Sequence, residues 1–196
     1  MPRPSNRETL LERGQKLLSG AGFTATGVQE ITDAGGVPKG SFYNYFRSKD
    51  DFGIEVLRRY AQEYFRQFEA ALVDGEGTPV ARLQVLFDEM IDDAREGGYS
   101  RGCLAGNLCQ ELAGSNPTFR DEIDGLFRQA QRYITEVLFE AQQAGELSAD
   151  EDPDELAAFV YNSWQGALLR MKATGSDRPL QQFRKVVFDR LLADES

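Results

Sequence analysis

The chain has 196 residues, a net charge of −10 at pH 7 and an apolar content of 41%, which is enough to bury a core. The acidic balance argues against a protein that coats nucleic acid through charge alone. The sequence has no histidine, so the usual general base and the commonest transition-metal ligand are missing. We therefore expect no metal site, no cofactor and no enzymatic activity.

No apolar run approaches the roughly 20 residues of a membrane-spanning helix. The N-terminal residues MPRPSNRET are polar and lack the apolar core of a signal peptide. The sequence thus predicts a cytoplasmic protein without membrane contact. Cys103 and Cys109 suit neither a disulfide within one helix nor a metal site, because six residues of helix turn them to different faces.

Apolar side chains recur at helical spacing through nearly the whole chain, and no segment has the alternation of a strand. The sequence predicts an all-α fold of about nine helices, with an N-terminal helix-turn-helix head and a C-terminal helical body. Thr26, or alternatively Thr24, is expected to cap the second helix, and Ser48 the fourth. The expected spans are about 6–21, 28–34, 38–46, 48–74, 80–96, 103–113, 119–144, 153–174 and 180–191.

The second and third predicted helices are short and are joined by Gly35-Gly36-Val37. This pattern of helix, tight glycine turn and helix can place its second helix in the major groove of DNA. Charge supports the interpretation, because residues 1–60 hold nine basic and seven acidic side chains, whereas the remainder holds 13 and 25. An acidic body with a mildly basic head fits a protein that touches phosphate at one end.

Within the second helix of the pair, Lys39 and Ser41 lie near the N-terminus, where a recognition helix meets base edges and phosphates. Phe42 and Phe46 are four residues apart and are expected to face inward. Lys49 begins the next helix, where its charge and the backbone N–H groups can bind a phosphate. The complete predicted DNA-binding set is Thr26, Gln29, Lys39, Gly40, Ser41, Tyr43, Asn44, Tyr45 and Lys49.

The string GVPKGSFYNYFRSKDDF closely resembles the signature of the TetR/AcrR family of bacterial repressors. Phe46-Arg47-Ser48-Lys49 matches the F-x-x-K that follows the recognition helix in this family, and Asn44 occupies a variable place. The resemblance implies a DNA-binding domain at 1–48 and a ligand-binding and dimerisation domain at 49–196. It also implies a homodimer that binds an inverted-repeat operator in double-stranded DNA and responds to a small-molecule effector.

Gly102-Cys103-Leu104 resembles the branch of this family that includes the N-ethylmaleimide repressor and acrylate-responsive repressors. That resemblance implies an electrophilic effector sensed by Cys103, with Lys172 at the place of a lysine in the N-ethylmaleimide repressor. Cys103 falls where the sixth helix should begin, and a thiolate there is stabilised by the helix dipole. The alternative is that Cys103 is a small buried residue that fills space.

Several aromatic residues of the body lie at helical spacing, and most of them are expected to be core. Phe87 and Trp164 are the two that we predict to contact an effector. Apolar side chains on the last two helices are too many for an exposed tail and predict the dimer interface, although some must pack within one chain. The predicted interface set is Phe159, Val160, Phe183, Val187 and Leu191.

These features favour a DNA-binding transcriptional regulator. We expect it to be a repressor that leaves its operator when an effector binds. The alternative is a helical dimeric module that binds a ligand or protein but not DNA. An enzyme is the weakest hypothesis, because the sequence offers no nucleophile–base pair.

Overall fold

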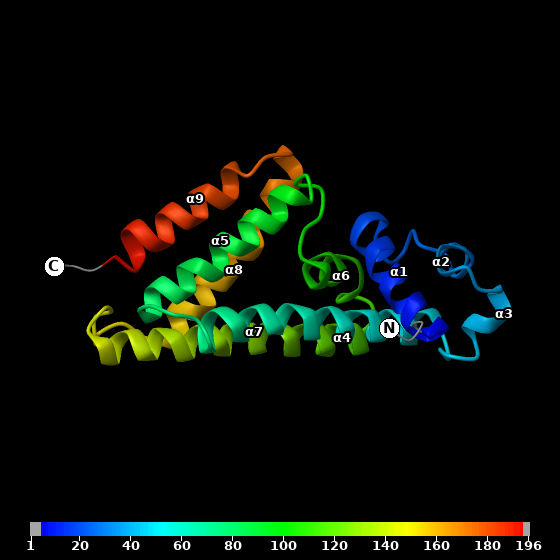
Figure 1. The fold of residues 1–196 in the computed structure, drawn as a ribbon, viewed down its shortest axis with the longest axis horizontal. Coiled ribbons are helices and arrows are strands. Elements are labelled where there is room, and N and C mark those ends of the chain that lie inside the picture. The colour runs from blue at the N-terminus through cyan, green and yellow to red at the C-terminus, as the bar shows by residue number, and fades with distance from the viewer. Residues whose placement is uncertain (1–4, 194–196) are drawn as a thin grey trace. The chain divides into compact units, whose positions relative to one another are not determined.

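The computed structural model describes residues 5–193 and contains nine α-helices, with no strand among these residues (Figure 1). The predicted all-α fold of about nine helices is therefore confirmed. In chain order the helices are α1 (Asn6–Ala21), α2 (Val28–Gly35), α3 (Lys39–Phe42), α4 (Lys49–Phe68), α5 (Pro79–Glu96), α6 (Leu104–Leu112), α7 (Pro117–Ala144), α8 (Pro153–Thr174) and α9 (Arg178–Val186). Single π-helical turns, Glu69–Val73 and Val187–Leu191, extend α4 and α9.

Two local expectations were wrong, and each has a physical reason. Thr26 does not cap α2, because its hydroxyl donates 2.7 Å to the carbonyl oxygen of Gly22, and Gly27 occupies the cap position. The third helix ends at Phe42 rather than near Phe46. Beyond it the chain tightens into a turn, in which the amide of Tyr45 donates to the carbonyl of Phe42 at 3.0 Å. The Ser48 cap is confirmed by its hydroxyl, which accepts from the amide of Asp51 at 3.0 Å.

The chain divides into two compact units, and each combines two separate stretches of sequence. The first contains the residues up to Glu63 together with Cys103–Asp124, and the second contains Tyr64–Gly102 with the residues from Gly125 onward. The divisions fall within α4 and α7. Consequently α6 and the first turns of α7 belong to the same unit as the helix-turn-helix segment.

In the first unit, α1 packs against α2 and against α6, and α2 packs against α3. Its core is apolar and is centred on Leu10, Leu18, Ile31, Phe42 and Phe52, all of which are fully buried. Such burial stabilises the unit by roughly 1.5–3 kcal/mol for each large side chain. The short α2 and α3, which would be marginal alone, are therefore held by packing.

In the second unit, α9 packs against both α8 and α5. Aromatic rings fill the space between them: the ring of Phe87 lies 5.2 Å from that of Trp164 and 5.0 Å from that of Phe183. At the surface, Arg184 of α9 donates to both carboxylate oxygens of Asp88 on α5, at 2.5 and 3.0 Å. Among residues 5–193, no helix combines the length and apolar character needed to cross a membrane.

Candidate nucleic-acid interface

The helix-turn-helix segment is built around the glycine turn that the sequence predicted. Gly36 ends α2 in the left-handed conformation, with φ +65°, which a glycine adopts without steric cost. Its amide and that of Val37 donate to carbonyl oxygens of the last turn of α2 at 3.1 and 3.0 Å. The chain then passes through Pro38, whose fixed φ of −60° precedes the first turn of α3.

Phe42 of α3 packs into a cluster of buried phenylalanines with Phe46 and Phe52. Phe42 lies 5.2 Å from Phe46 and 5.4 Å from Phe52, measured between ring centroids, and Phe46 lies 4.9 Å from Phe52. All three are essentially inaccessible to solvent, which confirms that Phe42 and Phe46 face inward. These tilted and edge-to-face pairs fix the orientation of α3 because their geometry is specific.

On the opposite side of this cluster, polar and aromatic side chains point outward. Tyr43 is 58% exposed and Tyr45 is 39% exposed, and Lys39 and Asn44 are also exposed. Among the described residues, neither the side chain of Lys39 nor that of Asn44 makes a hydrogen bond or ion pair, whereas the backbone amide of Asn44 donates to the carbonyl of Ser41 at 3.2 Å. Gly40 is exposed beside them and Ser41 is half-buried. The fold therefore brings six of the predicted DNA-binding residues, 39–41 and 43–45, to one short exposed stretch.

The other three predicted DNA-binding residues have different surroundings. Gln29 is exposed on the first turn of α2 and donates to Asp33 at 2.7 Å. Thr26 is fully buried, so its side chain offers nothing to a partner. Lys49 is half-buried, with its ammonium group 4.4 Å from the centre of the Phe23 ring and 3.5 Å from the carbonyl oxygen of Thr24.

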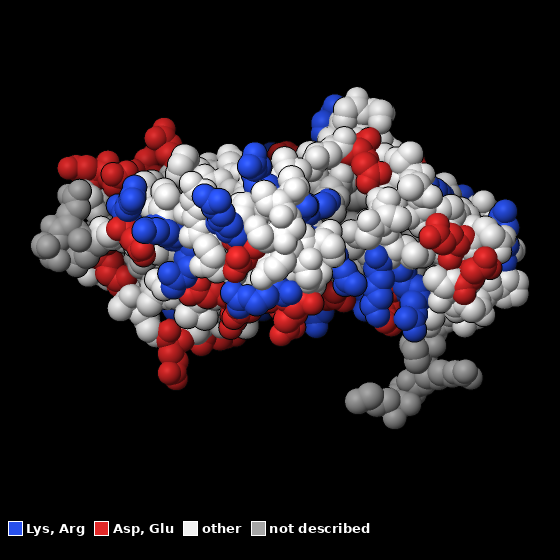
Figure 2. Space-filling model, turned by 90° about the horizontal axis from the view of Figure 1, so that it is seen from above, with Lys and Arg blue, Asp and Glu red and all other residues white. Residues whose placement is uncertain are grey.

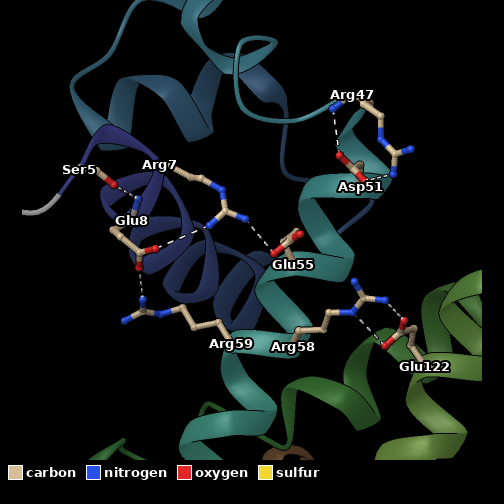
Figure 3. A network of polar contacts seen from close by, with 9 residues as sticks. All are labelled: Ser5, Arg7, Glu8, Arg47, Asp51, Glu55, Arg58, Arg59 and Glu122. Carbon is tan, nitrogen blue, oxygen red and sulfur yellow. Dashed lines mark hydrogen bonds and ion pairs between the residues drawn. The ribbon is translucent and has the colours of Figure 1, made fainter.

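A network of ion pairs surrounds the start of α4 and ties it to α1 and α7 (Figure 3). Arg7 and Glu55 lie 3.0 Å apart, as do Glu8 and Arg59, and Arg58 pairs with Glu122. Each exposed pair stabilises the fold by no more than about 1 kcal/mol. Together they orient α4 relative to its neighbours within the first unit.

One further ion pair lies where the turn after α3 meets α4. Arg47 lies 2.7 Å from Asp51, and its backbone amide also donates to that carboxylate at 3.0 Å. The hydrogen bond from the Arg47 side chain lowers the pKa of Asp51. On the face drawn in Figure 2, basic and acidic side chains are interspersed.

The candidate effector residues are divided between the two units. Cys103 is 7% exposed at the N-cap of α6, and its sulfur accepts from the amide of Gly106 at 3.4 Å and from the hydroxyl of Tyr60 at 3.5 Å. Both cysteines are free thiols. Lys172 lies exposed on the last turn of α8 in the other unit, where Phe87 and Trp164 are buried in contact with each other.

The predicted interface residues on α8 and α9 also differ in exposure. Phe159 is 54% exposed, whereas Val160, Phe183 and Val187 are buried within this chain and Leu191 is half-buried. An open groove of about 530 Å³ runs between the two helices and is flanked by Phe159 and Val186. Val186, which is 40% exposed, also lines this groove and lies outside the predicted interface set.

Sequence reasoning also missed Glu111 of α6. Its carboxylate accepts from the backbone amides of Phe23 and Thr24, at 3.2 and 2.8 Å. The partners are 87 and 88 residues apart in the chain, so no local pattern indicates the contact.

The geometry described so far defines a helix-turn-helix protein with an exposed third helix suited to DNA. Two family models match the chain: bacterial regulatory proteins of the tetR family over residues 10–56, and the tetracyclin repressor-like C-terminal domain over residues 79–187. The chain belongs to the TetR family. Like the relatives that follow, it is a transcriptional regulator.

Several curated relatives match nearly the whole chain. The transcriptional regulator AcuR of Cereibacter sphaeroides is 42% identical over 180 residues, which are 91% of this chain and 81% of AcuR. The repressor DhaR of Mycobacterium sp. strain GP1 is 39% identical over 98% of this chain and 95% of DhaR. The repressor NemR of Escherichia coli is 31% identical over 89% of this chain and 88% of NemR. The presence of AcuR and NemR confirms the branch that Gly102-Cys103-Leu104 indicated.

Solved structures agree with this assignment. A regulatory protein TetR from Rhodobacter sphaeroides superposes with a TM-score of 0.88 at 39% identity, covering 92% of this chain and 96% of that protein. The reduced form of E. coli NemR superposes with a TM-score of 0.85 at 30% identity, covering 98% of this chain and all of NemR. The fold is thus that of the family over the whole described chain.

Proposed function

We propose that the protein is a homodimeric cytoplasmic repressor that binds an inverted-repeat operator and leaves it when a small-molecule effector binds. The observation that carries this proposal is the exposed row of Lys39, Tyr43, Asn44 and Tyr45 above the buried phenylalanine cluster. A short helix followed by a tight turn, with polar and aromatic side chains exposed along both, can meet base edges in the major groove. We take residues 1–48 as the DNA-binding domain and 49–196 as the domain that binds effector and dimerises, with Lys49 at the junction as a further phosphate contact.

Two substitutions separate base recognition from phosphate binding. We expect Asn44→Ala to lower preference at particular base pairs by about 1–3 kcal/mol, because asparagine pairs with adenine in the major groove. We expect Lys49→Ala to weaken binding to every sequence. The slope of the logarithm of the binding constant against the logarithm of salt concentration should become shallower by about one. Fluorescence anisotropy with a promoter fragment, single-base variants of it and a salt titration measures both effects.

Each outcome can contradict its assignment. A Lys49→Ala protein with an unchanged salt slope would mean that Lys49 only holds the Phe23–Thr24 turn. Equal losses on all sequences would remove Asn44 from base recognition. If the unmodified protein shows no salt-sensitive, sequence-selective binding, the alternative of a helical dimer that does not bind DNA is favoured instead.

For the effector, we propose an electrophile that reacts with Cys103. Its sulfur lies at the N-cap of α6, 3.4 Å from the Gly106 amide and 3.5 Å from the Tyr60 hydroxyl, both of which donate to it. Because the side chain is 7% exposed, small reagents would reach it more readily than bulky ones. An adduct on the sulfur would crowd its contact with the hydroxyl of Tyr60 of α4, and α4 leads directly from the DNA-binding helices.

The test is Cys103→Ser. We expect N-ethylmaleimide to release the unmodified protein from operator DNA while forming an adduct at Cys103, located by mass spectrometry of peptides, and the Cys103→Ser variant to stay bound. Cys109→Ser is the matched control, since Cys109 lies on the same helix and is partly accessible. A serine variant that responds fully refutes the thiol mechanism.

A non-covalent effector in the second unit is the other candidate. The indole N–H of Trp164 is buried and has no acceptor among the described residues, which costs about 1–3 kcal/mol unless a ligand or solvent oxygen takes it. An effector with a hydrogen-bond acceptor beside Phe87 and Trp164 would satisfy this donor. Such an effector would change the emission of Trp164, the only tryptophan in the sequence, and would act equally on Cys103→Ser.

A further inference from the structure

The turn between α1 and α2 is held by a residue that lies far from it in the sequence. Oε1 of Glu111 accepts from the amide of Phe23 at 3.2 Å, and Oε2 accepts from the amide of Thr24 at 2.8 Å. One carboxylate thus binds two consecutive backbone amides, with a charged acceptor on each bond. These amides begin the turn that leads into α2, the first helix of the helix-turn-helix.

The turn is shaped to admit this carboxylate. Gly22 has φ +86°, a conformation that side chains with a Cβ rarely adopt. A Cβ built on Gly22 would lie only 2.5 Å from Oε1 of Glu111. The backbone conformation therefore favours glycine at this position, and a Cβ there would displace the Glu111 carboxylate from the turn.

Two other helices hold the same turn from different directions. The ring of Phe23 packs edge-on against Phe119 of α7, with centroids 5.2 Å apart. The ammonium group of Lys49, at the start of α4, lies 4.4 Å from the centre of the same Phe23 ring and 3.5 Å from the carbonyl oxygen of Thr24. All of these residues belong to the first compact unit.

We propose that Glu111 is a positioning residue for DNA binding: its carboxylate fixes the turn from which α2 starts and thereby the placement of α3. Glu111 falls in the region that matches the C-terminal domain model, residues 79–187, yet it acts on the segment that matches the DNA-binding model, residues 10–56. Because α6 runs from its cap at Cys103 to beyond Glu111, any movement of this helix reaches the turn. This role of Glu111 rests on the proposed DNA-binding function, because operator DNA is the ligand whose binding is measured.

The charge of Glu111 and its positioning role predict opposite effects on DNA affinity when the carboxylate is neutralised. As a bare negative charge, Glu111 repels phosphate, so neutralising it should strengthen DNA binding. As a positioning residue it favours binding, so neutralising it should weaken binding to the operator. Glutamine keeps the size of the side chain but offers one oxygen and one NH₂ group, so one backbone amide loses its acceptor.

The experiment compares Glu111→Gln with Asp121→Asn in the full-length protein. Asp121 lies exposed on α7 in the same unit, so its substitution removes the same charge without touching the turn. We expect Glu111→Gln to weaken binding to a promoter fragment by about tenfold, with an unchanged salt slope. We expect Asp121→Asn to bind as well as the unmodified protein or slightly better. Hydrogen exchange of the Phe23 and Thr24 amides should accelerate in Glu111→Gln, while exchange in α1 stays unchanged.

Operator binding by Glu111→Gln that equals or exceeds that of Asp121→Asn would overturn the proposal, as would unchanged exchange at Phe23 and Thr24. Faster exchange throughout α1 would overturn it too, because Glu111 would then stabilise the whole unit rather than place one turn. If the unmodified protein itself shows no preference for the promoter fragment, the proposed function fails, and the exchange measurement still decides whether Glu111 holds the turn.

Discussion

Replacement of Phe42 by alanine is expected to destabilise the first compact unit by about 3–5 kcal/mol, as is typical when a buried phenylalanine is truncated. The ring is fully buried and contacts both Phe46 and Phe52, at 5.2 and 5.4 Å between centroids. Its loss removes apolar burial and leaves a cavity under α3. Because whole domains are stable by only about 5–15 kcal/mol, we expect operator binding to be severely reduced.

The location of the single tryptophan makes this prediction specific. Trp164 lies in the second unit, so its emission follows unfolding of that unit, whereas circular dichroism follows the helices of both. In urea, Phe42→Ala should show an early loss of helical signal that the tryptophan does not report. Tyr45→Ala is the control: this ring is 39% exposed, so stability should change by no more than about 0.5 kcal/mol while DNA affinity falls. A Phe42→Ala protein with the unmodified urea midpoint would refute the packing argument.

A change of Phe159 to arginine is expected to convert the proposed dimer into monomers. Its ring is 54% exposed beside the groove between α8 and α9, and a charge there would be buried without a partner if two chains met on this face. Two linked heads bind an inverted repeat far more tightly than one head. We therefore expect affinity for the repeat to fall by a factor on the order of 100 or more, and affinity for a single half-site to stay unchanged.

Phe139→Arg is the matched control for this experiment. Phe139 is 56% exposed on α7 and does not line the groove. Analytical ultracentrifugation should find Phe159→Arg as a monomer at concentrations where Phe139→Arg and the unmodified protein are dimers. If Phe139→Arg is the variant that dissociates, the interface lies on α7 and the assignment to α8 and α9 is wrong.

The helices and the helix-turn-helix were predictable because their signals are local. Apolar periodicity, the Gly35-Gly36 turn and the Ser48 cap each act within a few residues, and the structure has the predicted helix ends at Asn6, Ala21 and Pro153. The end of α3 was not predictable in this way. Whether Tyr43–Tyr45 continues the helix or forms a turn depends on how Phe42 and Phe46 pack against Phe52, which is contributed by another helix.

The surroundings of the candidate site were less predictable, since they depend on contacts between distant segments. The sequence indicates that Thr26 suits a helix cap, but the carbonyl of Gly22 competes for its hydroxyl once the turn forms. It gives no sign that Lys49 lies over Phe23, or that Cys103 accepts a hydrogen bond from Tyr60. The effector therefore stays a proposal, whereas the family and its DNA-binding role are established.

The composition of the first unit from two stretches of chain has a consequence for engineering. If the DNA-binding segment of another regulator were to replace the one in this chain, residue 48 would be the obvious junction. Such a chimera would join a foreign α1–α2 turn to the native α6, and so separate Glu111 from Gly22, Phe23 and Thr24. Successful exchanges in this branch should transfer residues 103–124 together with the N-terminal segment, because the two stretches pack together in one compact unit.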